Sequence, residues 1–163
     1  MTADLVKLLL MRRYAGVVAT SDDLILLVRE PYDDGELHWG IPSGRVEEEE
    51  SFVEGATREL FEETGLMVSP TDLEEISRVD LRTAGGVEST SINFTVEVPR
   101  HEVVNRDPDE IVVEAAWIPT ERALALLAEV DYLPLVEPVR YFLESGEKSA
   151  WTYVDPLRRG VRS

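Results

Sequence analysis

Three closely spaced glutamates are the residues of this sequence best suited to do chemistry. Glu59, Glu62 and Glu63 lie at positions i, i+3 and i+4, so a helix would project them from one face. Two carboxylates about 5 Å apart repel each other by roughly 3 kcal/mol at an effective dielectric of about 20. A divalent cation reverses the sign of that interaction, because clustered hard oxygens are what Mg²⁺ and Mn²⁺ bind. The spacing therefore indicates a metal-binding face, and the plainer alternative is an acidic face in solvent.

The residues around these glutamates predict a helix from Ser51 to Thr64. A Ser-x-x-Glu capping box begins at Ser51, and Gly65 stands where a left-handed cap would end the helix. Gly55, inside the helix, costs about 1 kcal/mol relative to alanine. A helix selected only for stability would avoid both this glycine and the crowded carboxylates.

The position of the glutamates relative to the apolar stripe favours the metal interpretation. Val53, Ala56 and Leu60 form one apolar stripe along the predicted helix. Glu59 and Glu63 point close to the direction of this stripe, so we expect them at the rim of the core rather than fully in water. A carboxylate at such a position needs a partner to offset its desolvation.

Arg58 is the only cation within this helix. It can pair with Glu62, one turn further on, or reach back to Glu50 in the preceding loop. The residues alone leave both pairings open.

The composition bounds the kind of protein and its partners. The 163 residues suit a single domain over the whole chain. The net charge of −17 disfavours binding to DNA, RNA or an anionic membrane. There are no cysteines, which excludes disulfides and a thiol nucleophile and fits a cytoplasmic protein. Residues 5–11 predict a first strand or helix rather than a signal peptide, and no segment is long enough to span a membrane.

The remaining pattern predicts strands on both sides of the central helix. We expect strands at 15–19, 24–28, 39–42, 73–81, 90–98 and 111–118, an acidic loop at 43–50, and helices at 120–128 and 134–143. This order predicts an α/β fold with a mixed sandwich architecture. The basic tail after Trp151 is expected to be solvated, because the acidic body argues against a nucleic-acid patch.

The region around the glutamates resembles a known family motif. From Gly44 to Leu66 the chain reads Gly-x5-Glu-x7-Arg-Glu-Leu-x-Glu-Glu-x-Gly-Leu, which is similar to the box of the Nudix hydrolases (MutT-like proteins) at every fixed position. The lead-in from Trp39 to Gly44 also looks like that of the family, with Ser43 where a glycine is common. The resemblance implies an α/β/α sandwich with a mixed β-sheet.

The resemblance also implies roles for individual residues. Mg²⁺ or Mn²⁺ would be held by the glutamates of the box, namely Glu59, Glu62 and Glu63, with Glu50 near the metals. Arg58 would pair with Glu50 and tie the loop to the helix. Gly44 would let the loop turn sharply, and Gly65 would end the helix. The metals would bridge phosphate oxygens and orient a water for in-line attack on phosphorus.

The attacking water needs a general base. We favour Glu110, because it lies in the Asp-Pro-Asp-Glu loop just before a predicted strand and loops can reach the metals. Glu114 on that strand is an alternative, and Glu62 and Glu63 in the box compete for the role.

Three residues are candidates for substrate contact. Trp39 and Tyr32 could stack on a nucleobase, although packing in the core or a loop explains them equally well. Arg29 could meet a phosphate, although a surface ion pair is the simpler explanation.

The family implies a metal-dependent hydrolase that cleaves the pyrophosphate bond of a nucleoside diphosphate linked to another moiety. Nucleoside triphosphates, including oxidised ones, and nucleotide sugars are favoured, because sequence markers of other branches are absent. The alternatives are an ADP-ribose pyrophosphatase and a non-catalytic nucleotide sensor. The absence of cysteine argues against isopentenyl diphosphate isomerase. The expected partner is a small nucleotide, and family membership leaves a homodimer open.

Overall fold

The computed structural model describes Thr2 and residues 11–163. The strand or helix expected at residues 5–11 therefore lies outside the described residues, apart from Met11. None of the helices in the described part combines the length and apolar character that crossing a bilayer requires.

The centre of the molecule is one mixed sheet. The strands are β1 (Arg12–Ser21), β2 (Leu24–Pro31), β3 (Leu37–Gly40), β4 (Ser43–Arg45), β5 (Glu74–Thr83), β6 (Gly86–Glu97), β7 (Glu114–Pro119), β8 (Ser149–Tyr153) and β9 (Val161–Arg162). Their order is β3-β2-β1-β6-β5-β8-β9, with β4 paired to β1 and β7 paired to β2. The β1–β6 and β5–β8 pairs are parallel and the other pairs are antiparallel. The predicted mixed sheet is confirmed.

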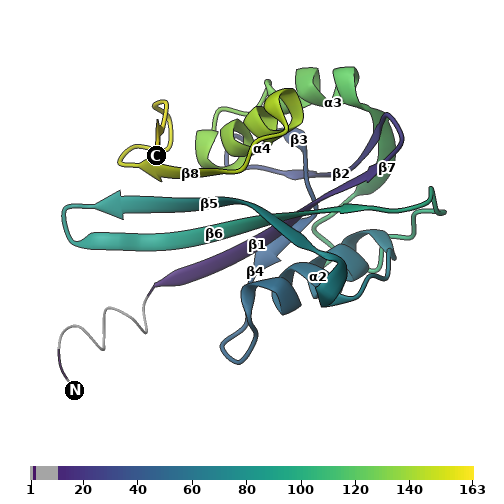
Figure 1. The fold of residues 1–163 in the computed structure, drawn as a ribbon, viewed down its shortest axis with the longest axis horizontal. Helices are drawn as coiled ribbons and strands as arrows, with labels where there is room; N and C mark the ends of the chain where they lie inside the picture. The colour runs from purple at the N-terminus through teal and green to yellow at the C-terminus, as the bar shows by residue number, and fades with distance from the viewer. Residues whose placement is uncertain (1, 3–10) are drawn as a thin grey trace.

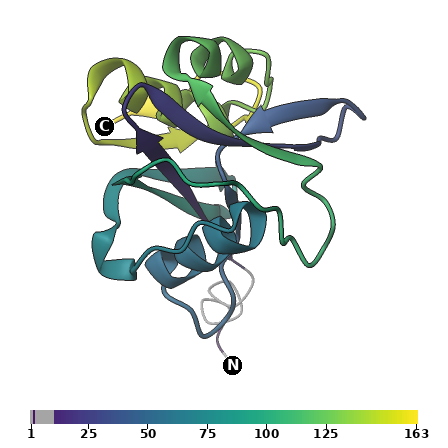
Figure 2. The same ribbon diagram turned by 90° about the vertical axis from the view of Figure 1, so that its right-hand side faces the viewer.

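Helices cover both sides of the strands. The helices are α2 (Phe52–Thr64), the short 3-10 turn η1 (Pro70–Asp72), α3 (Thr120–Leu127) and α4 (Leu133–Ser145). Figures 1 and 2 show α2 on one side and α3 with α4 on the other. Because side chains alternate along a strand, Val17 packs in the core under α2, and Val18 packs in the core under α3 and α4. The architecture is the predicted α/β/α sandwich.

Two of the differences from the predicted strands bear on the site. Residues 43–45 of the expected acidic loop form β4, because they pair with residues 14–16 of β1. Strand β7 begins at Glu114 rather than at Ile111. The reason is that the Asp107 carboxylate accepts the backbone N–H groups of Ile111 and Val112, at 2.8 and 2.9 Å, so these groups do not join the sheet.

The expectation of a solvated tail is wrong for the start of the C-terminal segment, and it is confirmed for Arg158 and Arg159, whose side chains are 85% and 87% exposed. Trp151 is 6% exposed and Tyr153 is 1% exposed, because β8 extends the sheet beside β5. Glu137 of α4 accepts hydrogen bonds from Tyr153 Oη (2.8 Å), Arg159 Nε (2.9 Å) and the Gly160 N–H (3.0 Å). One carboxylate thus fastens the last loop to the helix.

Candidate active site

Helix α2 has the ends that the sequence predicts. The Ser51 hydroxyl accepts the N–H of Glu54, whose side chain accepts the N–H of Ser51. Gly65 has a left-handed φ of 74°, and its N–H bonds the carbonyl of Phe61 at 2.8 Å. These caps set the length of the helix and so fix which turn carries the three glutamates.

Close packing explains the glycine inside this helix. A Cβ atom added to Gly55 would lie 3.0 Å from Val46 Cγ2, just beyond β4. The glycine therefore lets α2 approach the chain that follows β4, which offsets its helix-propensity cost.

Gly44 is also needed for close packing. The prediction that it lets the loop turn sharply is wrong. Gly44 lies within β4, outside the left-handed region of backbone space. A Cβ atom at this position would lie 2.2 Å from Glu59 Cδ and 2.3 Å from its Oε1. The box glycine makes room for a glutamate carboxylate rather than for a turn.

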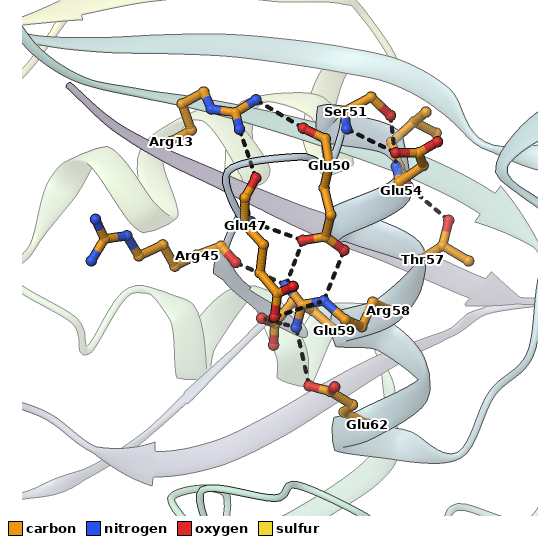
Figure 3. Close-up of polar contacts among 11 residues, drawn as sticks. Arg13, Arg45, Glu47, Glu50, Ser51, Glu54, Thr57, Arg58, Glu59 and Glu62 are labelled. Carbon is orange, nitrogen blue, oxygen red and sulfur yellow. Dashed lines mark hydrogen bonds and ion pairs between the residues drawn. The ribbon is translucent and has the colours of Figure 1, made fainter. Parts of the chain in front are cut away.

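Arg58 joins the loop and the helix through five hydrogen bonds (Figure 3). Its Nε and Nη2 donate to the two carboxylate oxygens of Glu50, both at 2.9 Å. Its Nη1 donates to Glu59 Oε1 at 2.8 Å and to Glu62 Oε2 at 3.2 Å, and its Nη2 also donates to the Arg45 carbonyl at 2.9 Å. Both pairings considered from the sequence are present. The paired guanidinium holds the pKa of Glu50 below its ordinary value.

Arg13 of β1 supports the loop from the other side, which the sequence did not indicate. It donates to the carbonyls of Glu50 (3.0 Å), Glu47 (2.7 Å) and Glu48 (3.3 Å), and its guanidinium lies 5.4 Å from the centre of the Phe52 ring. The loop that carries Glu50 is thus tied to β1 as well as to α2.

A cleft of about 1010 Å³ opens beside this assembly, and we call it the box cleft. Residues that line it include Arg13, Glu30, Ser43, Gly44, Arg45, Arg58, Glu59, Glu63, Asp107 and Asp109. Glu62 and Glu50 are not in this lining, and both are held beside Arg58. The acids that line it come from β2, the loop between β4 and α2 (Glu47 and Glu48), α2 itself and the loop before β7, so four parts of the chain meet at the cleft.

Glu63 is the most unusual group in the cleft. It is 5% exposed, and its Oε2 has no hydrogen-bond partner among the described residues. Burial, and then the nearby Glu30 and Glu59 carboxylates, raise its pKa to about 9. Burial also raises the pKa of Glu59 and of Glu30. Such a group needs a compensating positive charge in order to ionise at neutral pH.

The donor set fits a hard divalent cation. Carboxylate oxygens are suitable ligands for such a cation. The buried Glu63 Oε2 atom has no hydrogen-bond partner among the described residues and lies within a group of acids, so it is free to bind one. No three acidic or histidine side chains of the described residues are arranged to hold an ion as they stand. Arg58 occupies one oxygen of Glu59 and one of Glu62, so ion binding would require these carboxylates to reorient.

The sequence prediction missed several acids of the cleft, of which Glu30 and Asp107 lie closest to the box glutamates in their electrostatic effect. Side chains alternate along β2, so Glu30 lies on the same face of the strand as Leu26, which packs in the core under α2. This alternation is the pattern from which the position of Glu30 could have been predicted. Asp107 lies in the loop from which we had favoured Glu110. Its carboxylate accepts the N–H groups of Asp109, Ile111 and Val112 and so shapes the loop.

Glu110 itself is exposed, has a left-handed φ of 55° and does not line the box cleft. Its competitor Glu114 lies 3.8 Å from Arg29, so those two side chains form an ion pair on neighbouring strands.

The three candidate substrate contacts separate in space. Trp39 packs against the core under α3 and α4. Arg29 lines neither the box cleft nor a second cavity, of about 480 Å³, that shares Glu30 with the box cleft. Tyr32 packs on the same core and lines that adjoining cavity.

Comparison with known proteins defines the family. A model described as the NUDIX domain matches residues 10–137. A MutT-like protein of Streptomyces ambofaciens is 32% identical over 69% of this chain and 74% of its own. Mouse 8-oxo-dGDP phosphatase NUDT18 is 28% identical over 75% of this chain, which spans only 36% of that protein. The fold also matches the NUDIX domain of Shewanella oneidensis NrtR complexed with ADP ribose, with a TM-score of 0.64, 23% identity, and coverage of 82% and 88% of the two chains.

The chain therefore belongs to the Nudix family. Nudix hydrolases generally use divalent metal ions, in agreement with the chemistry of the box cleft. Some relatives are much longer than this chain, which covers 16% of the Bifidobacterium longum fusion protein.

Proposed function

We propose that the protein is a divalent-metal-dependent hydrolase that cleaves the pyrophosphate bond of a nucleoside diphosphate linked to another group. The observation that carries the proposal is Glu63, a buried carboxylate with an orphaned oxygen, aimed into a cleft shared with other acids. Such a site is stable in its ionised form only when a cation is present.

The residues of the box would bind the metal and hold one another in position. Glu59, Glu62 and Glu63 would hold Mg²⁺ or Mn²⁺, and Glu50 would restrain Arg58. The bound ion would neutralise phosphate charge and lower the pKa of water. Arg58 would keep the glutamates of the helix face in position between turnovers.

The candidates for the general base are Glu62 and Glu63 of the box, and Glu110 and Asp107 of the loop before β7. Glu110 remains our proposal from the sequence, and it would have to turn from solvent toward the cleft. Asp107 already lines the cleft and lies close enough to raise the pKa of Glu30, Glu59 and Glu63. Comparing kcat of Glu110→Gln and Asp107→Asn separates the two, because the loss of a general base lowers kcat by about 10²–10⁴-fold.

Arg45 is the residue we propose for contact with a substrate phosphate. Of the three arginines that line the box cleft, Arg13 and Arg58 donate to carbonyls and carboxylates. The Arg45 guanidinium extends away from that network and has no partner among the described residues (Figure 3). An anionic substrate that approaches a chain of net charge −17 would meet this cation.

The relatives bound the substrate class. One is named as an 8-oxo-dGDP phosphatase, and one solved domain is complexed with ADP ribose. The first name supports an oxidised nucleoside diphosphate as a substrate, and we propose nucleoside triphosphates and nucleotide sugars from the sequence. The ADP-ribose complex also favours a second candidate function, cleavage of ADP-ribose or its binding without cleavage.

The test is hydrolysis of a nucleotide panel, ADP-ribose included, with and without Mg²⁺. Wild-type protein should release phosphorylated products only with the metal. Glu63→Gln should lower turnover by at least about 10²-fold, whereas the exposed Glu121→Gln on α3 should leave it unchanged. Equal turnover by Glu63→Gln would remove the proposal, and binding of a nucleotide without any cleavage would favour the sensor alternative.

A further inference from the structure

The loop before β7 is docked on the C-terminal end of α2. The Val104 N–H donates to the Thr64 carbonyl at 2.9 Å, and the Arg106 N–H donates to the Glu62 carbonyl at 2.7 Å. Carbonyls in the last turn of a helix have no partner within that helix, so the loop satisfies groups that would otherwise be unpaired. We call residues 104–112 the arm. These two bonds set its position relative to the helix that carries the three glutamates.

Packing also holds the arm against α2. The Arg106 guanidinium lies 5.6 Å from the centre of the Phe61 ring, which is a cation–π contact. A Cβ atom added to Gly65 would lie 3.0 Å from the Val104 carbonyl oxygen, so the glycine that ends the helix also lets the arm approach closely. Backbone bonds and side-chain packing therefore fix the arm in one register on α2.

The side chain of Asn105 closes the arm into a ring. Its Oδ1 accepts the Asp107 N–H at 3.0 Å, and its Nδ2 donates to the carbonyl of the buried Val112 at 2.5 Å. Within the ring, the Asp107 carboxylate accepts the N–H groups of Ile111 and Val112. One amide side chain thus joins the two ends of the arm.

The ring holds the Asp107 carboxylate at the box cleft. Asp107 lines the cleft with Glu59 and Glu63, whereas Asn105 does not line it. The Asp107 Oδ1 atom accepts the N–H of Asp109 at 3.0 Å. A carboxylate oxygen has two acceptor sites, so Oδ1 can accept one further hydrogen bond from water. Asn105 can therefore affect chemistry in the cleft through Asp107, without touching a ligand.

We propose that Asn105 is a positioning residue, which holds the arm so that the Asp107 carboxylate faces the box cleft in the orientation that hydrolysis requires. The inference rests on the proposed function, since it gives Asp107 a part in that reaction. Without the amide, the two ends of the arm lose their shared partner, and the arm opens locally more often. A displacement of about 1 Å at a reacting group can lower the rate by about 10²-fold.

A double-mutant cycle tests whether Asn105 acts through Asp107. Asn105→Ala should lower kcat by at least about tenfold, with KM little changed. In an Asp107→Asn background the same change should lower kcat by less than about twofold, because the carboxylate that Asn105 positions is already gone. Glu102→Ala is the matched control, since it truncates an exposed side chain of the same loop that does not line the box cleft. Equal losses in both backgrounds would overturn the proposal, because a merely structural role does not depend on the carboxylate.

Amide hydrogen exchange tests the ring apart from catalysis. In Asn105→Ala, exchange at the Ile111 and Val112 amides should be at least about tenfold faster than in the wild type, although both N–H groups bond to Asp107 and not to Asn105. Unchanged exchange at both amides would overturn the proposal.

Failure of this inference is distinct from failure of the proposed function. Metal-dependent hydrolysis with a full kcat in Asn105→Ala would reject only the positioning role. A wild type that hydrolyses no nucleotide would reject the proposed function, whatever the exchange rates.

Discussion

At the scale of single residues, Glu63 is the acid of the box cleft whose pKa burial shifts furthest. Its folded-state pKa of about 9 lies above the ordinary value of 4.5, because burial and neighbouring acids penalise its charge. Between these pH values the folded protein keeps a proton that the unfolded chain has lost. The contribution of Glu63 to stability is therefore fully present below about pH 4.5 and is lost as the pH rises toward 9.

This linkage gives the first prediction. Without metal, the melting temperature of the wild type should fall from pH 5 toward pH 9 relative to that of Glu63→Gln, whose amide does not ionise. Saturating Mg²⁺ should reverse the effect in the wild type, since the ion binds the carboxylate form. Differential scanning calorimetry measures both curves. Parallel curves for the two proteins without metal would contradict the buried, protonated carboxylate.

The second prediction concerns Arg45. Arg45→Gln should raise KM about tenfold, a loss of roughly 1.4 kcal/mol, with little change in kcat, because contact with a phosphate is kept throughout the reaction. The control is Arg12→Gln, an exposed arginine of β1 that does not line the box cleft. Initial-rate kinetics separate the two parameters, and an equal change in both variants would argue for a general charge effect.

At the scale of elements, the seam between α2 and β4 places the glutamates. Gly55→Ala should lower the free energy of unfolding by about 1 kcal/mol, since overpacking against Val46 outweighs the gain in helix propensity. In a Val46→Ala background the same change should become neutral or stabilising. Urea denaturation of the wild type, the two single variants and the double variant measures this coupling. A gain of stability from Gly55→Ala in the wild-type background as well would show that the contact with Val46 is loose.

Local patterns explain why the α2 region could be read from the sequence. Its capping box, apolar stripe and Gly65 cap are all encoded within 15 residues, Ser51 to Gly65. Strand β4 could not be predicted, because three residues of Ser-Gly-Arg become a strand only by pairing with β1. Glu30 and Asp107 join the cleft from distant parts of the chain, so their proximity to Glu63 depends on tertiary structure.

At the scale of the whole molecule, the C-terminal segment extends the sheet beside β5 and is held to α4 by Glu137. Glu137→Ala would leave Tyr153 Oη and the Gly160 N–H without their acceptor and should cost about 2–3 kcal/mol of stability. Since this cluster is outside the box cleft, kcat of the folded variant should be unchanged. Thermal melting measures the loss of stability, and initial rates measure kcat. Lost activity at full stability would place Glu137 in catalysis.

The whole fold was predictable in outline and the tail was not. Periodicity gave the sandwich, because each strand and helix shows one or two apolar faces. The burial of Trp151 and Tyr153 depends on parallel pairing with β5, across more than 60 intervening residues, which no local pattern encodes.

Binding of Mn²⁺ tests most directly whether the glutamate face of α2 is a metal site. Electron paramagnetic resonance should show Mn²⁺ bound by the wild-type protein without nucleotide. Glu63→Gln should weaken that binding by at least about tenfold, and Glu121→Gln should not. Equal Mn²⁺ affinity in all three proteins would contradict the account, because the buried carboxylate would then have no cation to explain it.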